Sequence, residues 1–150
     1  MEEVKPYQFS FEKLEVWQLA KKLASEIYKA TQSFPQEEKY SLVSQMRRAA
    51  VSVCANIAEG TTRQTAKDQA HFTTVSFSSL MELFNHIIIA TDLGYLNTEK
   101  LTAFRKQVQL LSIKLSNLKT SQVKRIGKLG YMWLLITAPY LLQPLIPLSS

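Results

Sequence analysis

Apolar residues recur every three or four positions along most of the chain, which is the period of an amphipathic α-helix. The pattern predicts four helices, over residues 11–32, from about Pro35 to Gly60, from about Thr65 to Leu93, and from Asn97 to about residue 118. The last of these has the most regular apolar seam, made of Leu101, Phe104, Val108, Leu111, Leu115 and Leu118. Such a seam is typical of an antiparallel bundle or a coiled coil. Four helices with short connections predict an all-α fold, an up-down-up-down antiparallel four-helix bundle.

Capping and turn residues mark the ends of these helices. Ser33 and Gln36 have the spacing of a capping box at the start of the second helix, and Gly60 fits the left-handed position that ends many helices. The other boundaries are indicated by N-cap and stop residues at Thr65, Gly94 and Asn97.

An apolar C-terminal extension follows the predicted bundle. From Leu129 to Leu148 the chain has 20 residues without a charge, preceded by Lys124, Arg125 and Lys128, and this is the length and flanking charge of a membrane helix. Prolines 139, 144 and 147 argue against a straight membrane span, because each removes a helical hydrogen bond. We expect a tail that folds over an apolar surface, with membrane insertion as the alternative. The chain is thus divided into a lead (1–10), a bundle (11–120) and an apolar, proline-containing tail (121–150).

Composition narrows the class of protein. The chain has 150 residues, of which 46% are hydrophobic, so it can form one domain with a buried core. Its single cysteine, Cys54, excludes an internal disulfide and a cysteine-based zinc site, and indicates a reducing compartment. The first residues lack the basic and apolar regions of a secretion signal, so we expect a cytoplasmic protein.

The net charge is +6, and the positive excess lies in the C-terminal part of the chain. A sequence pI near 9.5 suits an anionic partner, either nucleic acid or acidic lipid.

A polar row lies beside the core stripe of the predicted second helix. At 100° per residue, one sector of about 80° contains Gln45, Arg48, Ser52, Asn56, Glu59 and Arg63. Amide, hydroxyl, guanidinium and carboxylate groups can satisfy one another when partly buried. We expect a polar network or subunit interface that joins Gln45, Arg48, Ser52, Asn56 and Glu59 to Ser79 and Glu82 of the third helix. A ligand site is the alternative.

The predicted third helix is apolar on two sides. One stripe contains Phe72, Leu80, Leu83, Ile87 and Ala90, and a second contains Phe77, Met81, Phe84 and Ile88. One core contact cannot bury both stripes. We expect the second stripe to be an apolar interface with another copy, and the alternative is that the tail covers it.

The sequence offers no catalytic arrangement. Glu82 and His86 are four residues apart with no second copy, whereas di-iron bundles repeat a Glu-x-x-His motif on two helices. We therefore expect no metal, no cofactor and no enzymatic activity, and we expect Glu82 to pair with Arg48. The rival hypothesis, an enzyme that uses Glu59, Glu82 and His86, predicts a bound metal or a clustered pocket.

Several stretches resemble the bacterial four-helix bundle proteins, also called 23S rRNA intervening-sequence proteins. The resemblance covers about residues 9–118 and is carried by Phe11, Leu14, Val16, Trp17, Phe34–Pro35, Tyr40, Gln45–Ser52, Ala55–Gly60, Ser79–Leu83 and Asp92–Leu96. In two places this chain departs from the family pattern: Ser78 stands where glycine is usual, and residues 121–150 extend past the usual end.

The resemblance implies a four-helix bundle that assembles as a homopentamer. The family is related to accessory proteins of diversity-generating retroelements, which contact nucleic acid and a reverse transcriptase, and it implies no known catalysis. The positions that match the family motif are expected to be structural, and they are Gln45, Arg47, Arg48, Ser52, Asn56, Glu59, Gly60, Arg63, Ser79 and Glu82.

Together these features predict a non-enzymatic, oligomeric bundle that is an interaction or nucleic-acid-associated protein. Its partners would be its own copies, RNA or DNA, and a protein. A scaffold that binds membranes or proteins through the tail is the alternative. Contacts to the phosphate backbone are expected from Arg47, Arg63, Lys67, Arg105, Lys106 and Lys114. The sequence shows no aromatic and basic platform of the kind on which single strands stack.

Overall fold

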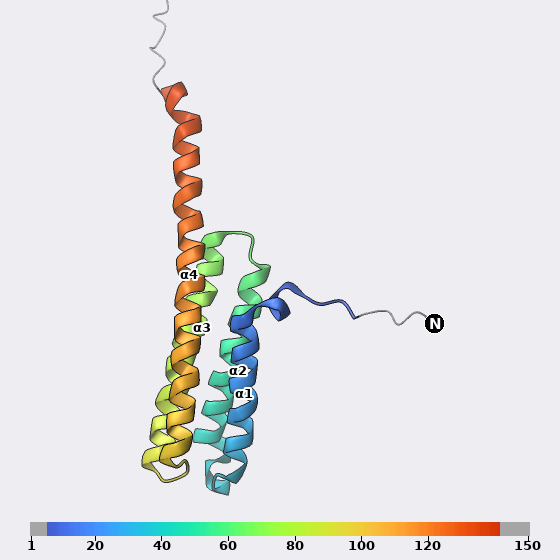
Figure 1. The fold of residues 1–150 in the computed structure, drawn as a ribbon, viewed down its shortest axis with the longest axis vertical. Coiled ribbons are helices and arrows are strands. Elements are labelled where there is room, and N and C mark those ends of the chain that lie inside the picture. Colours follow the sequence, from blue (N-terminus) through green and yellow to red (C-terminus); the bar gives the residue numbers. More distant parts are fainter. Residues whose placement is uncertain (1–5, 142–150) are drawn as a thin grey trace, which may run out of the picture.

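Four α-helices joined by short turns make up the protein (Figure 1). The computed structural model describes the backbone of residues 6–141 and the side chains of residues 6–128. The helices are α1 (Glu15–Ala30), α2 (Leu42–Thr62), α3 (Ala66–Asp92) and α4 (Thr98–Leu141), with 3₁₀ turns η1 (Ser10–Lys13), η2 (Thr31–Ser33) and η3 (Gln36–Tyr40). The predicted all-α, four-helix fold class is confirmed.

Cross-helix contacts show how neighbouring helices run. Arg48 near the start of α2 lies by Glu82 of α3, while Gly60 near the end of α2 lies against Phe72 near the start of α3. The two helices are therefore antiparallel, as Figure 1 shows for each consecutive pair.

The core is formed by the apolar stripes that the periodicity predicts. Its fully buried side chains include Leu23, Ile27, Met46, Val53, Leu80, Leu83, Ile87, Leu111 and Leu115. Each of these side chains stabilises the fold by about 1.5–3 kcal/mol relative to an exposed position.

Small residues bring α2 and α3 close together. Ser76 of α3 is buried, and its hydroxyl donates to the Val53 carbonyl at 2.9 Å. A Cβ atom on Gly60 would lie 3.3 Å from the Cβ of Phe72. The expectation that Gly60 ends the second helix is wrong, because Gly60 is buried inside α2 and allows a close approach. Among the described residues, the one glycine with a positive φ is Gly94 (φ 76°), which follows α3 as expected.

The start of the second helix also differs from the prediction. The Ser33 hydroxyl donates to the Ala30 carbonyl, so Ser33 and Gln36 form no capping box. α2 begins at Leu42, because Ser41 has a non-helical backbone (φ −112°, ψ −105°). The Glu38 carboxylate takes the capping role: it accepts hydrogen bonds from the Leu42 backbone N–H at 3.3 Å and from the Ser41 hydroxyl.

The other two predicted caps are confirmed. Thr65 Oγ1 accepts from the Asp68 backbone N–H at 3.1 Å, and Asn97 Oδ1 accepts from the Lys100 backbone N–H at 2.8 Å.

The last helix is much longer than the periodicity predicts. α4 continues as one helix to Leu141 and runs past the ends of the other helices (Figure 1). The predicted fold-back of the tail is therefore wrong for residues 121–141. Because no proline lies between Thr98 and Ala138, the helix propagates without a break over these residues. Pro144 and Pro147 lie outside the described residues.

At the end of the bundle where α3 begins, hydrogen bonds hold α4 against α3. Gln122 Oε1 accepts from the buried Thr73 hydroxyl at 2.9 Å, and Arg125 donates to Gln69 at 2.8 Å. The expected domain boundary at residue 120 therefore lies inside a helix that is still attached to the bundle.

Within the part of the chain described with side chains, α3 is the one helix long and apolar enough to cross a membrane by length and composition. It packs on both α2 and α4. Leu80, Leu83 and Ile87 are buried in the core, whereas Met81 and Ile89 are exposed.

Candidate functional site

A polar seam follows the line where α2 and α3 meet. The Ser52 and Ser79 hydroxyls lie 2.9 Å apart, and Asn56 Nδ2 donates to the Ser52 carbonyl at 2.8 Å and to its hydroxyl at 3.1 Å. One turn earlier, Arg48 donates to Gln45 Oε1 at 2.5 Å.

The expected pair across the seam forms. The Arg48 guanidinium lies 3.8 Å from Glu82 Oε1, with both side chains largely exposed. The structure therefore brings together Gln45, Arg48, Ser52, Asn56, Ser79 and Glu82 along one seam.

Glu59 and Arg63 lie at the far end of this row and form a separate pair. Arg63 forms an ion pair with Glu59, and its guanidinium lies 4.5 Å from the centroid of the Phe72 ring. The Glu59 carboxylate and the Arg63 guanidinium are thus paired with each other at the end of α2, next to Phe72 of α3.

His86 is the most unusual residue of the seam. Both of its ring nitrogens are buried without a hydrogen-bond partner, and Nε2 lies 3.7 Å from Glu82 Oε1, beyond hydrogen-bonding distance. In the described part of the chain, no group of three or more His, Cys, Asp or Glu side chains could hold a metal ion. The seam can fix the register of two helices through hydrogen bonds.

Cys54 is a poor nucleophile where it stands. Burial raises the pKa of its thiol to about 11, so the thiol is protonated at neutral pH.

The expected apolar interface is only partly exposed. Phe77 and Phe84 pack against the core, and the Arg105 guanidinium lies 4.8 Å from the centroid of the Phe84 ring. Met81 is 38% exposed, and on α4 Leu110 and Ile113 are also exposed. Two of the four residues of the second α3 stripe thus pack inward, and Met81, Leu110 and Ile113 remain as exposed apolar side chains on α3 and α4.

The residues predicted to contact phosphate do not form one patch. Four of them also contact other side chains of the bundle, which are Thr31 for Arg47, Glu59 for Arg63, Phe84 for Arg105 and Glu15 for Lys114. Lys67 in the first turn of α3 and Lys106 on α4 are exposed.

A different basic surface forms where α1 and α2 meet. A hollow of about 420 Å³ lies there, lined by Trp17, Lys21, Ala24, Ser25, Tyr28, Lys29, Gln32, Val51 and Cys54. Of the described residues that line it, none is acidic. Beside it, Arg47 Nε donates to Thr31 Oγ1 at 2.9 Å, and the Arg47 guanidinium lies 4.8 Å from the centroid of the Tyr28 ring.

The two glutamates of α1 bond to α4. Lys114 Nζ donates to Glu15 at 2.7 Å, and Gln107 Nε2 donates to Glu26 at 2.6 Å. The α1/α2 surface is therefore positive although α1 itself contains acidic residues.

Sequence reasoning missed Lys21, Lys29, Trp17 and Tyr28 as a group. Trp17, Lys21 and Tyr28 lie at positions i, i+4 and i+11, which share one side of a helix, and this spacing was a usable signal. The addition of Arg47 depends on the packing of α2.

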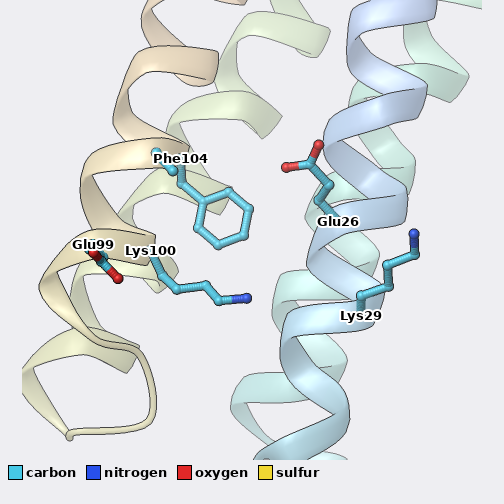
Figure 2. A pocket seen from close by; sticks show the side chains of 6 residues that line it. Glu26, Lys29, Glu99, Lys100 and Phe104 are labelled. Atoms are coloured by element: carbon cyan, nitrogen blue, oxygen red, sulfur yellow. The ribbon is translucent and has the colours of Figure 1, made fainter.

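A second groove separates α1 from α4. It has a volume of about 530 Å³ and is lined by Glu26, Lys29, Glu99, Lys100, Ala103 and Phe104. Figure 2 shows Lys100 and Phe104 reaching from α4 toward α1, with Glu26 opposite them. Two carboxylates and two ammonium groups balance there, so this groove does not select for an anion.

Comparisons with known proteins agree with this architecture. A family model described as 23S rRNA-intervening sequence protein matches residues 12–117. Among solved structures, the chain is similar to a protein of unknown function from the S23 ribosomal protein family of Bacteroides thetaiotaomicron. The TM-score is 0.65 at 17% identity, over 70% of this chain and 95% of that chain, and at this identity the likeness shows the fold alone. No curated protein matches the chain.

Proposed function

We propose, since this chain belongs to the 23S rRNA-intervening sequence protein family, that it is a non-enzymatic, self-associating helical bundle that binds the phosphate backbone of nucleic acid. The observation that carries the proposal is the acid-free basic surface between α1 and α2, with Lys21 and Lys29 in the hollow and Arg47 beside it.

Phosphate binding follows from the charges on this surface. Lysine and arginine side chains bind phosphate oxygens and release condensed counterions, which makes the affinity fall as salt rises. Glu15 and Glu26 are bonded to α4, so they do not compete with phosphate for Lys21 and Lys29. The remaining predicted contacts, at the end of α2 and on α3 and α4, would add a diffuse attraction.

A pair of matched variants tests where nucleic acid binds. The double substitution Lys21→Glu with Lys29→Glu changes the α1 surface, and Lys67→Glu with Lys106→Glu makes the same charge change elsewhere. We measure binding to a labelled single-stranded RNA by fluorescence polarisation at about 50 and about 200 mM salt.

The wild type should lose affinity as salt rises. The α1 variant should bind about tenfold more weakly, and the slope of log affinity against log salt should be shallower by about 1.4, since each phosphate contact contributes about 0.7. Equal losses in the two variants would favour the dispersed set of contacts, and no binding at low salt would refute the proposal.

Self-association is proposed from the apolar side chains that α3 and α4 leave exposed. Met81 on α3 and Leu110 and Ile113 on α4 are exposed, and partner copies would bury them. The homopentamer implied by the family resemblance is the copy number we expect.

Light scattering on a sizing column, with absorbance at 260 and 280 nm and at low and high salt, measures mass and bound nucleic acid together. A monomer at every concentration contradicts self-association, and Leu110→Glu with Ile113→Glu should reduce the mass of a true oligomer.

A second candidate function is attachment to a membrane through the end of α4. The observation that favours it is that α4 continues past the other helices after its last described bond to α3, at Arg125. Lys124, Arg125 and Lys128 precede the uncharged stretch and would bind anionic headgroups. In a flotation assay with anionic vesicles, the full chain should float and a chain lacking residues 129–150 should not. A full chain that stays at the bottom removes this candidate.

A further inference from the structure

Aromatic rings follow one another from the N-terminal segment onto α1. Centroid distances are 5.1 Å from Tyr7 to Phe9, 6.1 Å from Phe9 to Phe11, and 4.9 Å from Phe11 to Trp17. Tyr7 and Phe9 are 80% and 56% exposed. Figure 1 shows this segment leaving the bundle beside the start of α1. Exposed rings in series are the surfaces on which unpaired bases stack.

Trp17 joins this aromatic series to the basic surface. It lines the α1/α2 hollow of about 420 Å³, and it also lines a second hollow of about 530 Å³ together with Gln8, Glu12, Gln18, Lys21, Lys22 and Ser25. Trp17, Lys21 and Ser25 line both hollows, so the two hollows adjoin along this row of α1, and together they are called the track.

Each ring on this track has a cation beside it. The Lys21 ammonium lies 5.4 Å from the centroid of the Trp17 ring, and Arg47 lies over Tyr28. The hydrogen bond to Thr31 holds Arg47 in place against one side of the Tyr28 ring. Tyr28 is still 43% exposed. Base stacking and phosphate contact are therefore available side by side.

The shape of the track favours unpaired bases over a duplex. Trp17 and Tyr28 are 11 residues apart, or about 16 Å along the helix at 1.5 Å per residue. Between them the hollow contains Ala24, Val51 and Cys54, which are small and apolar. Such a floor accepts the flat faces of bases, and those faces are covered in a duplex by the neighbouring base pairs.

We infer that the α1/α2 surface binds single-stranded nucleic acid, with unpaired bases on Trp17 and Tyr28 and backbone phosphates at Lys21, Lys29 and Arg47. This inference rests on the proposed function and specifies its ligand. It differs from the expectation from sequence that no stacking platform exists, because the proposed platform is assembled from two helices and the N-terminal segment.

Tryptophan fluorescence tests the stacking directly. The chain has two tryptophans, so a full chain with Trp133→Phe leaves Trp17 as its reporter. We titrate it with oligothymidylate of about 20 nucleotides and with a duplex of the same length. The single strand should quench Trp17 and bind more tightly, and the duplex should bind without comparable quenching.

A matched pair of ring deletions locates the contact. Tyr28→Leu removes the ring next to Arg47 on the track, whereas Phe72→Leu removes a ring that Arg63 covers on the α2/α3 side. Tyr28→Leu should weaken single-strand binding about tenfold, the loss of one base–aromatic stack, and leave duplex binding unchanged. Phe72→Leu should bind like the parent, and circular dichroism verifies that both variants fold.

The outcomes separate this inference from the proposed function. The inference is wrong if single and double strands bind equally, if Trp17 is not quenched and if Tyr28→Leu binds normally. The phosphate-binding function still stands in that case if Lys21→Glu with Lys29→Glu weakens binding. If the wild type binds neither form at low salt, both fail.

Discussion

Ser76 and Ser78 are two positions apart on α3 but lie in different surroundings. Ser76 is fully buried against α2, where its hydroxyl donates to the Val53 carbonyl. Ser78 is exposed, and its hydroxyl donates to Thr74 of its own helix at 3.2 Å. The family resemblance implies a glycine at position 78, but a glycine at this exposed position would not bring two helices of the described bundle closer together. A larger side chain can be accommodated at Ser78, which faces solvent, and not at Ser76, which is buried against α2.

We predict that Ser76→Leu lowers the free energy of unfolding by about 1–3 kcal/mol, because overpacking forces α2 and α3 apart. Ser78→Leu, the same change on the solvent side, should alter it by less than about 0.5 kcal/mol. Urea denaturation followed by circular dichroism measures both values. Similar losses in the two variants would mean that α2 and α3 do not pack as described.

At the scale of elements, the connection before α2 depends on Glu38. Its carboxylate caps α2 at Leu42 and also accepts a hydrogen bond from the Tyr95 hydroxyl at 3.2 Å, so it links the α1–α2 connection to the α3–α4 turn. The hydrogen bonds from the Ser41 hydroxyl and the Leu42 N–H lower the pKa of the Glu38 carboxyl below its ordinary value.

This lowered pKa gives a stability that depends on pH. The charged carboxylate stabilises the fold above the unfolded-state pKa, and the contribution is lost as the pH falls through the folded-state pKa. We predict that Glu38→Gln lowers the melting temperature at neutral pH and that the difference from wild type shrinks toward about pH 3. Glu37→Gln makes the same charge change one residue earlier and should show a smaller effect. A Glu38→Gln difference that is constant with pH would contradict the capping role.

At the scale of the whole molecule, the sides of the bundle differ in chemistry. The α2/α3 seam is polar, α3 and α4 each expose apolar side chains, and the α1/α2 surface is basic and aromatic. Beyond the bundle, α4 continues alone from the region of its last bonds to α3, at Gln122 and Arg125. This arrangement separates the extension from the core.

We predict that deleting residues 129–150 leaves the cooperative unfolding of the bundle nearly unchanged, because the described core and its cross-helix bonds lie before residue 129. Far-UV circular dichroism should show less helix per chain, and the melting temperature should stay within about 2 °C, the shift expected for about half a kcal/mol. A large drop would show that the extension supports the bundle.

Much of the fold followed from local patterns. Thr65 and Asn97 cap helices through bonds to residues three positions away, so their roles could be read from sequence. The cap by Glu38 is equally local, since its bonds to Ser41 and Leu42 span three and four residues, but the Ser33 and Gln36 spacing led to an earlier start. The role of Gly60 could not be read in this way, because Gly60 is needed for the approach of Phe72 rather than for a turn.

The candidate sites divide in the same manner. The polar seam was predicted because its residues share one face of one helix, and Ser79 and Glu82 lie on the facing helix as expected. The dispersed phosphate contacts remain a prediction from charge. Phe77 and Phe84 pack against the core, which the apolar pattern of α3 alone did not indicate.

The sequence by itself determined the helices, most of their caps and the stripe that each buries, because these depend on periodicity and on contacts within a few residues. Tertiary structure alone decided that Arg47 meets Tyr28, that the α1 glutamates bond to α4, and that α4 passes the bundle without folding back. These features join residues far apart in the chain, and which side chains meet depends on how the helices pack.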